Sequence, residues 1–168
     1  RPRPDWLGPA EASTAEVLGH GWCADPGSCG GSYDCSELDA SVLTLGLCGL
    51  LPPDDPRFVK TVEAVDEHLR VEHGVYRYRY EDGLPGVEGA FNICTAWHIQ
   101  ALAAVGRAED ARVLLEKYIG LAGPTGLMSE EWDPLTGRAL GNHPQAYSHV
   151  GLIDAVLAVE TALRQGAD

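Results

Sequence analysis

Basic residues are scarce in this chain. Its 168 residues include 12 Lys and Arg against 25 Asp and Glu, which gives a formal net charge of −13 at pH 7. Nucleic acids and anionic membrane surfaces are bound through clustered Lys and Arg, so the composition argues against both as partners. The negative charge does not exclude neutral ligands such as sugars. The charge also has a simpler explanation, because a net charge keeps a globular domain in solution.

Long apolar runs are lacking as well. We find no run long enough to cross a bilayer, and residues 1–4 (Arg-Pro-Arg-Pro) have no apolar segment behind them that would make a signal peptide. The first residue is not Met, so we expect a processed chain or a piece of a longer one. The odd number of cysteines, five, disfavours a secreted disulfide framework. We therefore expect a cytoplasmic location and no membrane partner.

The cysteines fall into two groups. Cys48 and Cys94 lie inside apolar helical runs and are predicted to be small buried hydrophobes. Cys23, Cys29 and Cys35 are evenly spaced in a Gly-rich stretch. A zinc site there is one interpretation, but the spacing is not of the C-x2-C type and no second ligand pair follows. A reduced, flexible loop is favoured, and we predict no metal and no cofactor.

Hydrophobic periodicity predicts a mostly helical chain. Residues 10–19 are expected to form a short helix, with Ser13 or Thr14 as a cap, followed by a Gly- and Cys-rich loop. We predict that residues 1–36 form this helix and loop, and that residues 37–168 form the main domain.

The next segment carries a capping signal. Ser36 followed by Asp39 fits the N-terminus of a helix. Apolar residues over 37–50 cover nearly every helical face, which predicts a deeply buried helix. Prolines end it, and Pro56 suits the first position of a second helix. That helix, over 57–70, is amphipathic.

A similar pair of helices follows. Residues 75–80, Val-Tyr-Arg-Tyr-Arg-Tyr, alternate in residue type, which predicts a short strand or extended segment. An apolar helix over 91–105 precedes an amphipathic one over 108–121, a loop over 124–145 and a last helix over 146–163. Pairing a nearly all-apolar helix with an amphipathic one is what a two-layer barrel of helices needs. We therefore predict an all-α fold with one short extended segment.

The most informative stretch lies in the predicted loop. The run from Met128 to Pro134 places adjacent carboxylates, Glu130 and Glu131, beside Trp132. Sugar-cleaving sites combine such groups, since carboxylates move protons and aromatic rings stack on pyranose faces. We predict the functional site here.

Four segments together resemble bacterial glycoside hydrolase family 15, the glucoamylase and trehalase-like enzymes. They are SELDAS at 36–41, LPPDDP at 51–56, EDGLPGVEGAF at 81–91, and the stretch just described with residues 141–149. The resemblance is to the C-terminal part of the family. It implies part of an (α/α)6 barrel, the six-hairpin glycosidase fold, and hydrolysis of α-linked glucosides with inversion. One carboxylic acid then protonates the leaving oxygen and one carboxylate activates water.

The same resemblance implies roles for individual residues. Glu130 is the general base. Glu131 is a less favoured base, a substrate contact or a carboxylate that braces the loop. Trp132 stacks on sugar or packs the loop, and Tyr147 lies near the sugar or in the core at the start of a helix. Glu88 binds a sugar hydroxyl or stabilises a helix N-terminus.

The family's general acid lies in a Trp-Glu segment that this sequence does not match. We therefore expect a portion of an enzyme for α-glucosides or trehalose, which acts with a missing N-terminal half or self-associates through exposed inner helices. The alternative is a non-catalytic helical module that binds a sugar or a protein. A zinc-bound regulatory protein is a third, weaker hypothesis.

Overall fold

The structure, a computed structural model, describes residues 3–25, 27–33, 37–81, 83 and 88–166. The helices in chain order are α1 (Pro4–His20), η1 (Ala40–Leu43), α2 (Thr44–Leu47), α3 (Pro56–His68), α4 (Asn92–Ala104), α5 (Ala108–Ile119), η2 (Gly120–Ala122) and α6 (Ala146–Gln165). The strands are β1 (Trp22–Cys23), β2 (Ser28–Cys29), β3 (Arg70–Val71), β4 (Gly74–Val75), β5 (Ala90–Phe91), β6 (Glu131–Trp132) and β7 (Ala139–Leu140).

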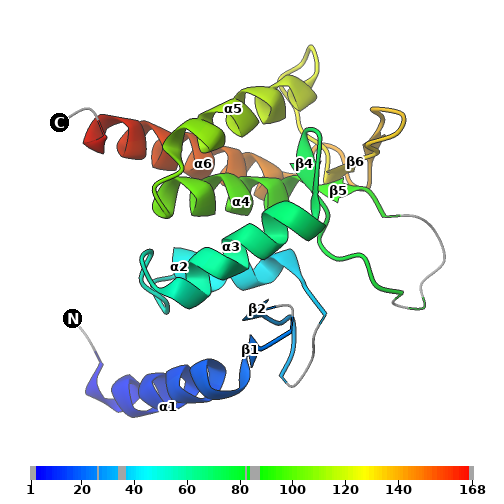
Figure 1. Cartoon of the computed structure of the whole chain (residues 1–168). Coiled ribbons are helices and arrows are strands. Elements are labelled where there is room, and N and C mark those ends of the chain that lie inside the picture. The colour runs from blue at the N-terminus through cyan, green and yellow to red at the C-terminus, as the bar shows by residue number, and fades with distance from the viewer. Residues whose placement is uncertain (1–2, 26, 34–36, 82, 84–87, 167–168) are drawn as a thin grey trace.

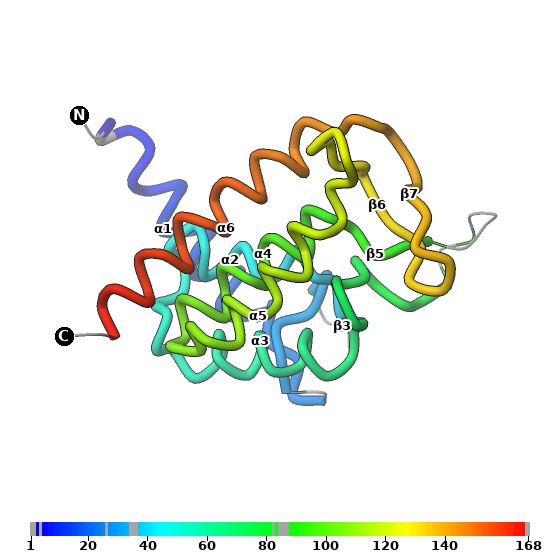
Figure 2. The backbone as a smooth tube through the Cα atoms, turned by 90° about the horizontal axis from the view of Figure 1, so that it is seen from above, coloured from blue at the N-terminus to red at the C-terminus, as the bar shows by residue number. Residues whose placement is uncertain are grey.

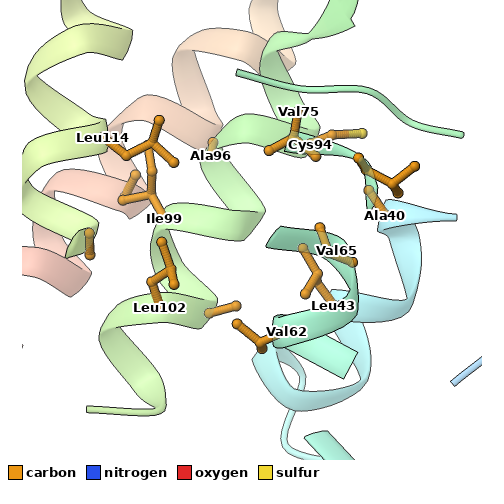
Figure 3. Close-up of a cluster of buried hydrophobic side chains, with 14 of the residues drawn as sticks. Ala40, Leu43, Val62, Val65, Val75, Cys94, Ala96, Ile99, Leu102 and Leu114 are labelled. Atoms are coloured by element: carbon orange, nitrogen blue, oxygen red, sulfur yellow. The ribbon is translucent and has the colours of Figure 1, made fainter. Parts of the chain in front are cut away.

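Helix α4 runs through the centre of the molecule. Helices α5 and α6 pack along one side of it, and α3 and η1 pack along the other (Figure 1). Figure 3 shows the resulting core, with Ile99 of α4 beside Leu114 of α5 and with Val62 and Val65 of α3 on the opposite side. Apolar side chains around nearly the whole of α4 explain why it takes the central position.

Four of the five helices predicted for the main domain are confirmed. They are α3, α4, α5 and α6, each within a few residues of its expected range. Pro56 occupies the first position of α3, as predicted, and Asp55 caps that helix by accepting a hydrogen bond from the Arg57 N–H at 2.9 Å. An apolar pattern that continues over several helical turns explains the agreement.

The first helix is longer than its sequence pattern predicts. It begins at Pro4 because proline suits a first helical turn, where its missing N–H leaves no bond unmade. Ser13 and Thr14 lie inside α1, so their predicted capping role is wrong. Trp6 and Leu7 are exposed, and α1 extends away from the layer of α4, α5 and α6 (Figure 2).

The cysteine-rich stretch contains an antiparallel hairpin, not only a flexible loop. Strand β1 pairs with β2, so that Trp22 lies opposite Cys29. Cys29 is buried, and its N–H donates to Thr61 Oγ1 of α3 at 2.9 Å. This contact ties the hairpin to the core. Cys35 lies outside the described residues.

The predicted long helix over 37–50 is wrong. The chain instead makes the 3-10 turn η1 and the single α-helical turn α2. Glycine lowers helix propensity, and Gly49 takes a left-handed conformation with φ of 81°. The predicted cap at Asp39 is confirmed, since its Oδ1 accepts from the Ser41 N–H at 2.8 Å. Ser36 lies outside the described residues.

The two cysteines that were predicted to be buried differ. Cys94 is buried on α4, as predicted. Cys48 is exposed, so that prediction is wrong. The prediction placed Cys48 inside a long buried helix, but α2 ends at Leu47, just before it.

A five-stranded antiparallel sheet, in the order β3-β4-β5-β6-β7, was not predicted. Of the segment 75–80, only Val75 belongs to a strand, and the predicted loop 124–145 contains the paired strands β6 and β7. Each strand is two residues long, which is too short to show an alternating pattern. Residues 82 and 84–87, part of the segment EDGLPGVEGAF, lie outside the described residues. The fold is thus mostly helical with a small sheet.

Helix α6 is long and apolar enough to cross a membrane by length and composition alone, so the expectation of no such run is wrong. In this structure α6 packs against α4 and α5. Its other face exposes Val150, Ile153 and Leu157, which are 56%, 59% and 60% accessible.

Candidate functional site

Backbone hydrogen bonds on both sides fix Glu130, the residue before β6. Its N–H donates to Asn142 O at 2.9 Å, and its own carbonyl accepts from the Asn92 N–H at 3.0 Å. Asn92 is the first residue of α4, and its side-chain amide also donates to Ser129 O at 2.8 Å. The residue is therefore held between the start of the central helix and the segment that leads into α6.

The Glu130 carboxylate accepts one hydrogen bond at each oxygen. The Asn142 N–H donates to Oε2 at 3.0 Å, and the Tyr147 hydroxyl donates to Oε1 at 2.6 Å. Both bonds lower the pKa of Glu130, the Asn142 N–H more than the phenol. Gly141, with φ of 66°, makes the close approach possible, because a Cβ there would lie 2.7 Å from Oε2. The carboxylate is thus ionised and fixed in orientation at neutral pH.

Glu130 opens onto a cavity of about 530 Å³. The cavity is lined by Ser41, Arg77, Phe91, Ile93, Cys94, Trp97, Glu130 and Tyr147. Among these described lining residues Glu130 is the one carboxylate. The apolar and aromatic walls with a few polar groups are typical of a small-ligand site.

A second cavity, of about 350 Å³, continues along α4. Ile93, Trp97 and Tyr147 line both cavities, and Leu47 and Val150 extend the second one toward α2 and α6. The two hollows therefore follow one side of the central helix, from Glu130 toward the exposed face of α6.

Arg77 is a cavity residue that the sequence analysis missed. Its Nε donates to Asp39 Oδ2 at 3.2 Å, and the Asp39 side chain is 8% exposed. The buried carboxylate anchors the guanidinium, which stays half exposed at the cavity wall. The alternation of Tyr and Arg over 76–80 was a signal for it, because an extended segment sends alternate side chains to opposite sides.

Glu131 does not line either cavity. Successive side chains of an extended strand point to opposite faces, which separates it from Glu130. Its Oε2 accepts from the Gly89 N–H at 2.8 Å, and burial raises the pKa of its carboxyl. This geometry favours the loop-bracing interpretation over a base or a substrate contact.

Trp132 is buried, with 5% of its surface exposed. Its ring meets His73 edge-on, with ring centroids 5.7 Å apart, and a Cβ on Gly74 would lie 2.7 Å from its Nε1. The ring of this β6 residue is thus packed against His73 and the start of β4, which favours the packing interpretation over sugar stacking. Glu88 is exposed and lines neither cavity, so its role stays a prediction.

Tyr147 is the predicted aromatic that the structure brings to Glu130. It lies at the start of α6, as one interpretation had it, and it also lines both cavities. In the part of the chain that the structure describes, no group of three or more His, Cys, Asp or Glu residues is arranged to hold a metal ion. The site is therefore a carboxylate, a phenol and a guanidinium around a partly apolar cavity.

A family model for the glycosyl hydrolases of family 15 matches residues 27–157. The chain belongs to glycosyl hydrolase family 15. It is 41% identical over 157 residues to a trehalase of Mycobacterium tuberculosis and 43% identical over 157 residues to a trehalase of Mycolicibacterium smegmatis, covering 92% of this chain and 23% of each relative. A trehalase of Thermoplasma acidophilum is 38% identical over 162 residues, covering 96% of this chain and 28% of the relative.

A solved glycosidase structure shares the fold with a TM-score of 0.79 at 22% sequence identity. The match covers 94% of this chain and 46% of that glycosidase. The family 15 chain therefore spans about a quarter of the length of its curated relatives and about half of the solved fold.

Proposed function

We propose that this family 15 chain supplies the general base and part of the sugar pocket of an inverting α-glucoside hydrolase, with trehalose as the substrate. The observation that carries the proposal is Glu130, an ionised carboxylate held by two donors at the wall of a cavity. The kinship with trehalases favours trehalose over other α-glucosides.

The chemistry needs an ionised base at neutral pH. Glu130 takes a proton from a water as that water attacks the anomeric carbon, and a separate acid protonates the departing oxygen. The two carboxyl groups of such enzymes stand about 6.5–9.5 Å apart to admit the water. Because Glu130 is the one carboxylate among the described residues that line its cavity, the acid comes from a segment that faces it across the cavity.

The fold that suits this chemistry is half of an (α/α)6 barrel. In our proposal α4 and α6 belong to the inner ring, while the amphipathic α3 and α5 belong to the outer ring. The half exposes Val150, Ile153 and Leu157 on α6, beside the second cavity. We propose that helices equivalent to the rest of a family 15 domain cover this face and carry the acid. A second copy is a poorer partner, because each copy carries a net charge of −13.

A graft tests this function. The chain replaces the matched segment of the Mycolicibacterium smegmatis trehalase, and glucose release from trehalose is measured. We expect turnover that falls by about 10²–10⁴-fold with Glu130→Gln, whereas Glu131→Gln, the matched control, keeps most of it. A folded graft in which Glu130→Gln leaves turnover unchanged contradicts the proposal.

The second candidate is a non-catalytic sugar-binding module, which the single carboxylate of the cavity favours. Calorimetry with the chain alone separates the two. Trehalose binding by the chain that survives Glu130→Gln, together with a folded but inactive graft, supports the binding module.

A further inference from the structure

The phenol of Tyr147 and the carboxylate of Glu130 form a short polar contact at the cavity. The hydroxyl donates to Oε1 at 2.6 Å across a separation of 17 residues. A bond this short between a neutral donor and an ionised acceptor is of the stronger, charge-assisted kind. The contact joins the start of α6 to the residue before β6.

The start of α6 is anchored independently of that phenol. The Gln145 N–H donates to Met128 O at 2.9 Å, and the Met128 N–H donates to His149 Nε2 at 3.1 Å. The Ser148 hydroxyl donates to Ser129 O at 2.8 Å. The first turn of α6 is therefore bonded to the two residues that precede Glu130, which fixes the distance between phenol and carboxylate.

We infer that Tyr147 is a positioning residue: its hydroxyl holds Oε1 of Glu130 and thereby fixes the direction in which the base meets water. The catalytic meaning of this inference rests on the proposed function. A carboxylate offers about four lone-pair positions, and the Asn142 N–H and the Tyr147 hydroxyl each take one, on different oxygens. These two bonds leave lone-pair positions that can receive a proton from water in the cavity.

The same bond sets the acidity of the base. It lowers the pKa of Glu130, second to the bond from the Asn142 N–H, and burial together with the bond to Glu130 raises the pKa of the phenol. Tyr147 thus stays protonated, and so keeps its donor, throughout the titration of Glu130 and at neutral pH. Other ionisable groups near the carboxylate are Arg77 and Cys94 in the cavity wall and Glu131 along the strand.

Tyr147→Phe is the variant that isolates the hydroxyl. The ring lines both cavities with Ile93 and Trp97, so a smaller residue would merge the cavities and confuse the result. Tyr118→Phe is the matched control, because Tyr118 is buried and its hydroxyl contacts Ser148 O, not Glu130.

The readout is an NMR titration of the Glu130 carboxyl in the full chain, labelled with ¹³C-glutamate and assigned by Glu130→Gln. We expect Tyr147→Phe to raise the pKa of Glu130 by about 0.5 to 1 pH unit, whereas Tyr118→Phe leaves it unchanged. A Glu130 titration that does not move in folded Tyr147→Phe overturns the inference. Should that variant fail to fold, 3-fluorotyrosine at position 147, a more acidic donor, is expected to lower the pKa of Glu130, and an unchanged value overturns the inference.

A kinetic arm separates this inference from the proposed function. In the trehalase graft, Tyr147→Phe is expected to shift the acid limb of kcat/KM for trehalose upward by the same amount as the Glu130 pKa. An acid limb that stays in place while the pKa moves overturns the positioning role. Failure of the proposed function gives a different result: Glu130→Gln then leaves turnover unchanged, while Tyr147→Phe still raises the pKa of Glu130.

Discussion

The two sides of helix α4 contrast sharply. The covered side comprises its two faces toward α3 and toward α5, where His98, Ile99 and Leu102 have no exposed surface. Toward the cavities, a stripe of half-buried residues, Ile93, Trp97 and Gln100, recurs at i, i+4 and i+7. Most residues on both sides are apolar. The difference teaches that one side packs this chain together, whereas the other carries the cavities on which the proposed function depends.

The strongest test of this contrast is Leu102→Ala on the covered side. Leu102 is fully buried, so its truncation leaves a cavity that the packed helices cannot close. We expect the free energy of unfolding to fall by about 2–5 kcal/mol, as measured by urea denaturation. A loss below about 1 kcal/mol would mean that this side is not packed as described.

We expect acid to lower the free energy of unfolding through two groups on the covered side, His98 and Asp66. His98 Nε2 donates to Asp66 Oδ1 at 3.0 Å, and Asp66 also accepts from Arg70 at 2.7 Å and from Arg107 at 3.0 Å. The bond from His98, followed by those from the arginines, lowers the pKa of Asp66 well below its usual range, and burial lowers the pKa of His98. Both groups therefore bind protons more readily in the unfolded chain.

The sign of the pH dependence follows from this preference. The contribution of His98 is complete above its unfolded pKa of about 6.5 and is lost as the pH falls below it. The contribution of Asp66 is complete above its unfolded pKa of about 3.9 and is lost on further acidification. We expect the free energy of unfolding to fall between pH 6.5 and 5 by at most about 1.4 kcal/mol per pH unit from His98. His98→Gln, which keeps a donor for Asp66, should flatten that part of the curve; a curve that stays equally steep contradicts the assignment.

The smallest effect is expected on the open side. Leu157 is 60% exposed, so Leu157→Ser should change the free energy of unfolding of this chain by no more than about 0.5 kcal/mol. In the trehalase graft the same change should cost about 1–2 kcal/mol, because helices then cover the face. Equal costs in the two settings would show that nothing packs on this side of α6.

The sequence predicted the covered side better than the open one. Long periodic segments identified α3 to α6, and Asp39 and Pro56 marked helix starts by capping chemistry that acts over a few residues. The sheet was not predicted because its strands are too short to show an alternating pattern. In addition, β5 pairs with β6 across about 40 residues of chain. The apolar segment 91–105 predicted a helix, but its pattern cannot say which neighbours cover that helix.

The candidate site was predicted in part for the same reason. The motif pointed to Glu130 and Tyr147 separately. Local sequence spacing does not reveal the pairing of β6 with β7 or the anchoring of α6, which bring the two residues together. The contact between them, the anchoring of Arg77 by Asp39 and the packing of Trp132 against His73 all depend on tertiary pairing. Their functional roles stay predictions.

Chemical rescue of Glu130→Ala tests the central claim most directly. Azide fits the space that the carboxylate leaves and attacks the anomeric carbon without giving up a proton. In the trehalase graft we expect Glu130→Ala to lose trehalose hydrolysis, and azide to restore turnover with β-glucosyl azide as the product. Hydrolysis by Glu130→Ala at the parent rate without azide would contradict Glu130 as the base.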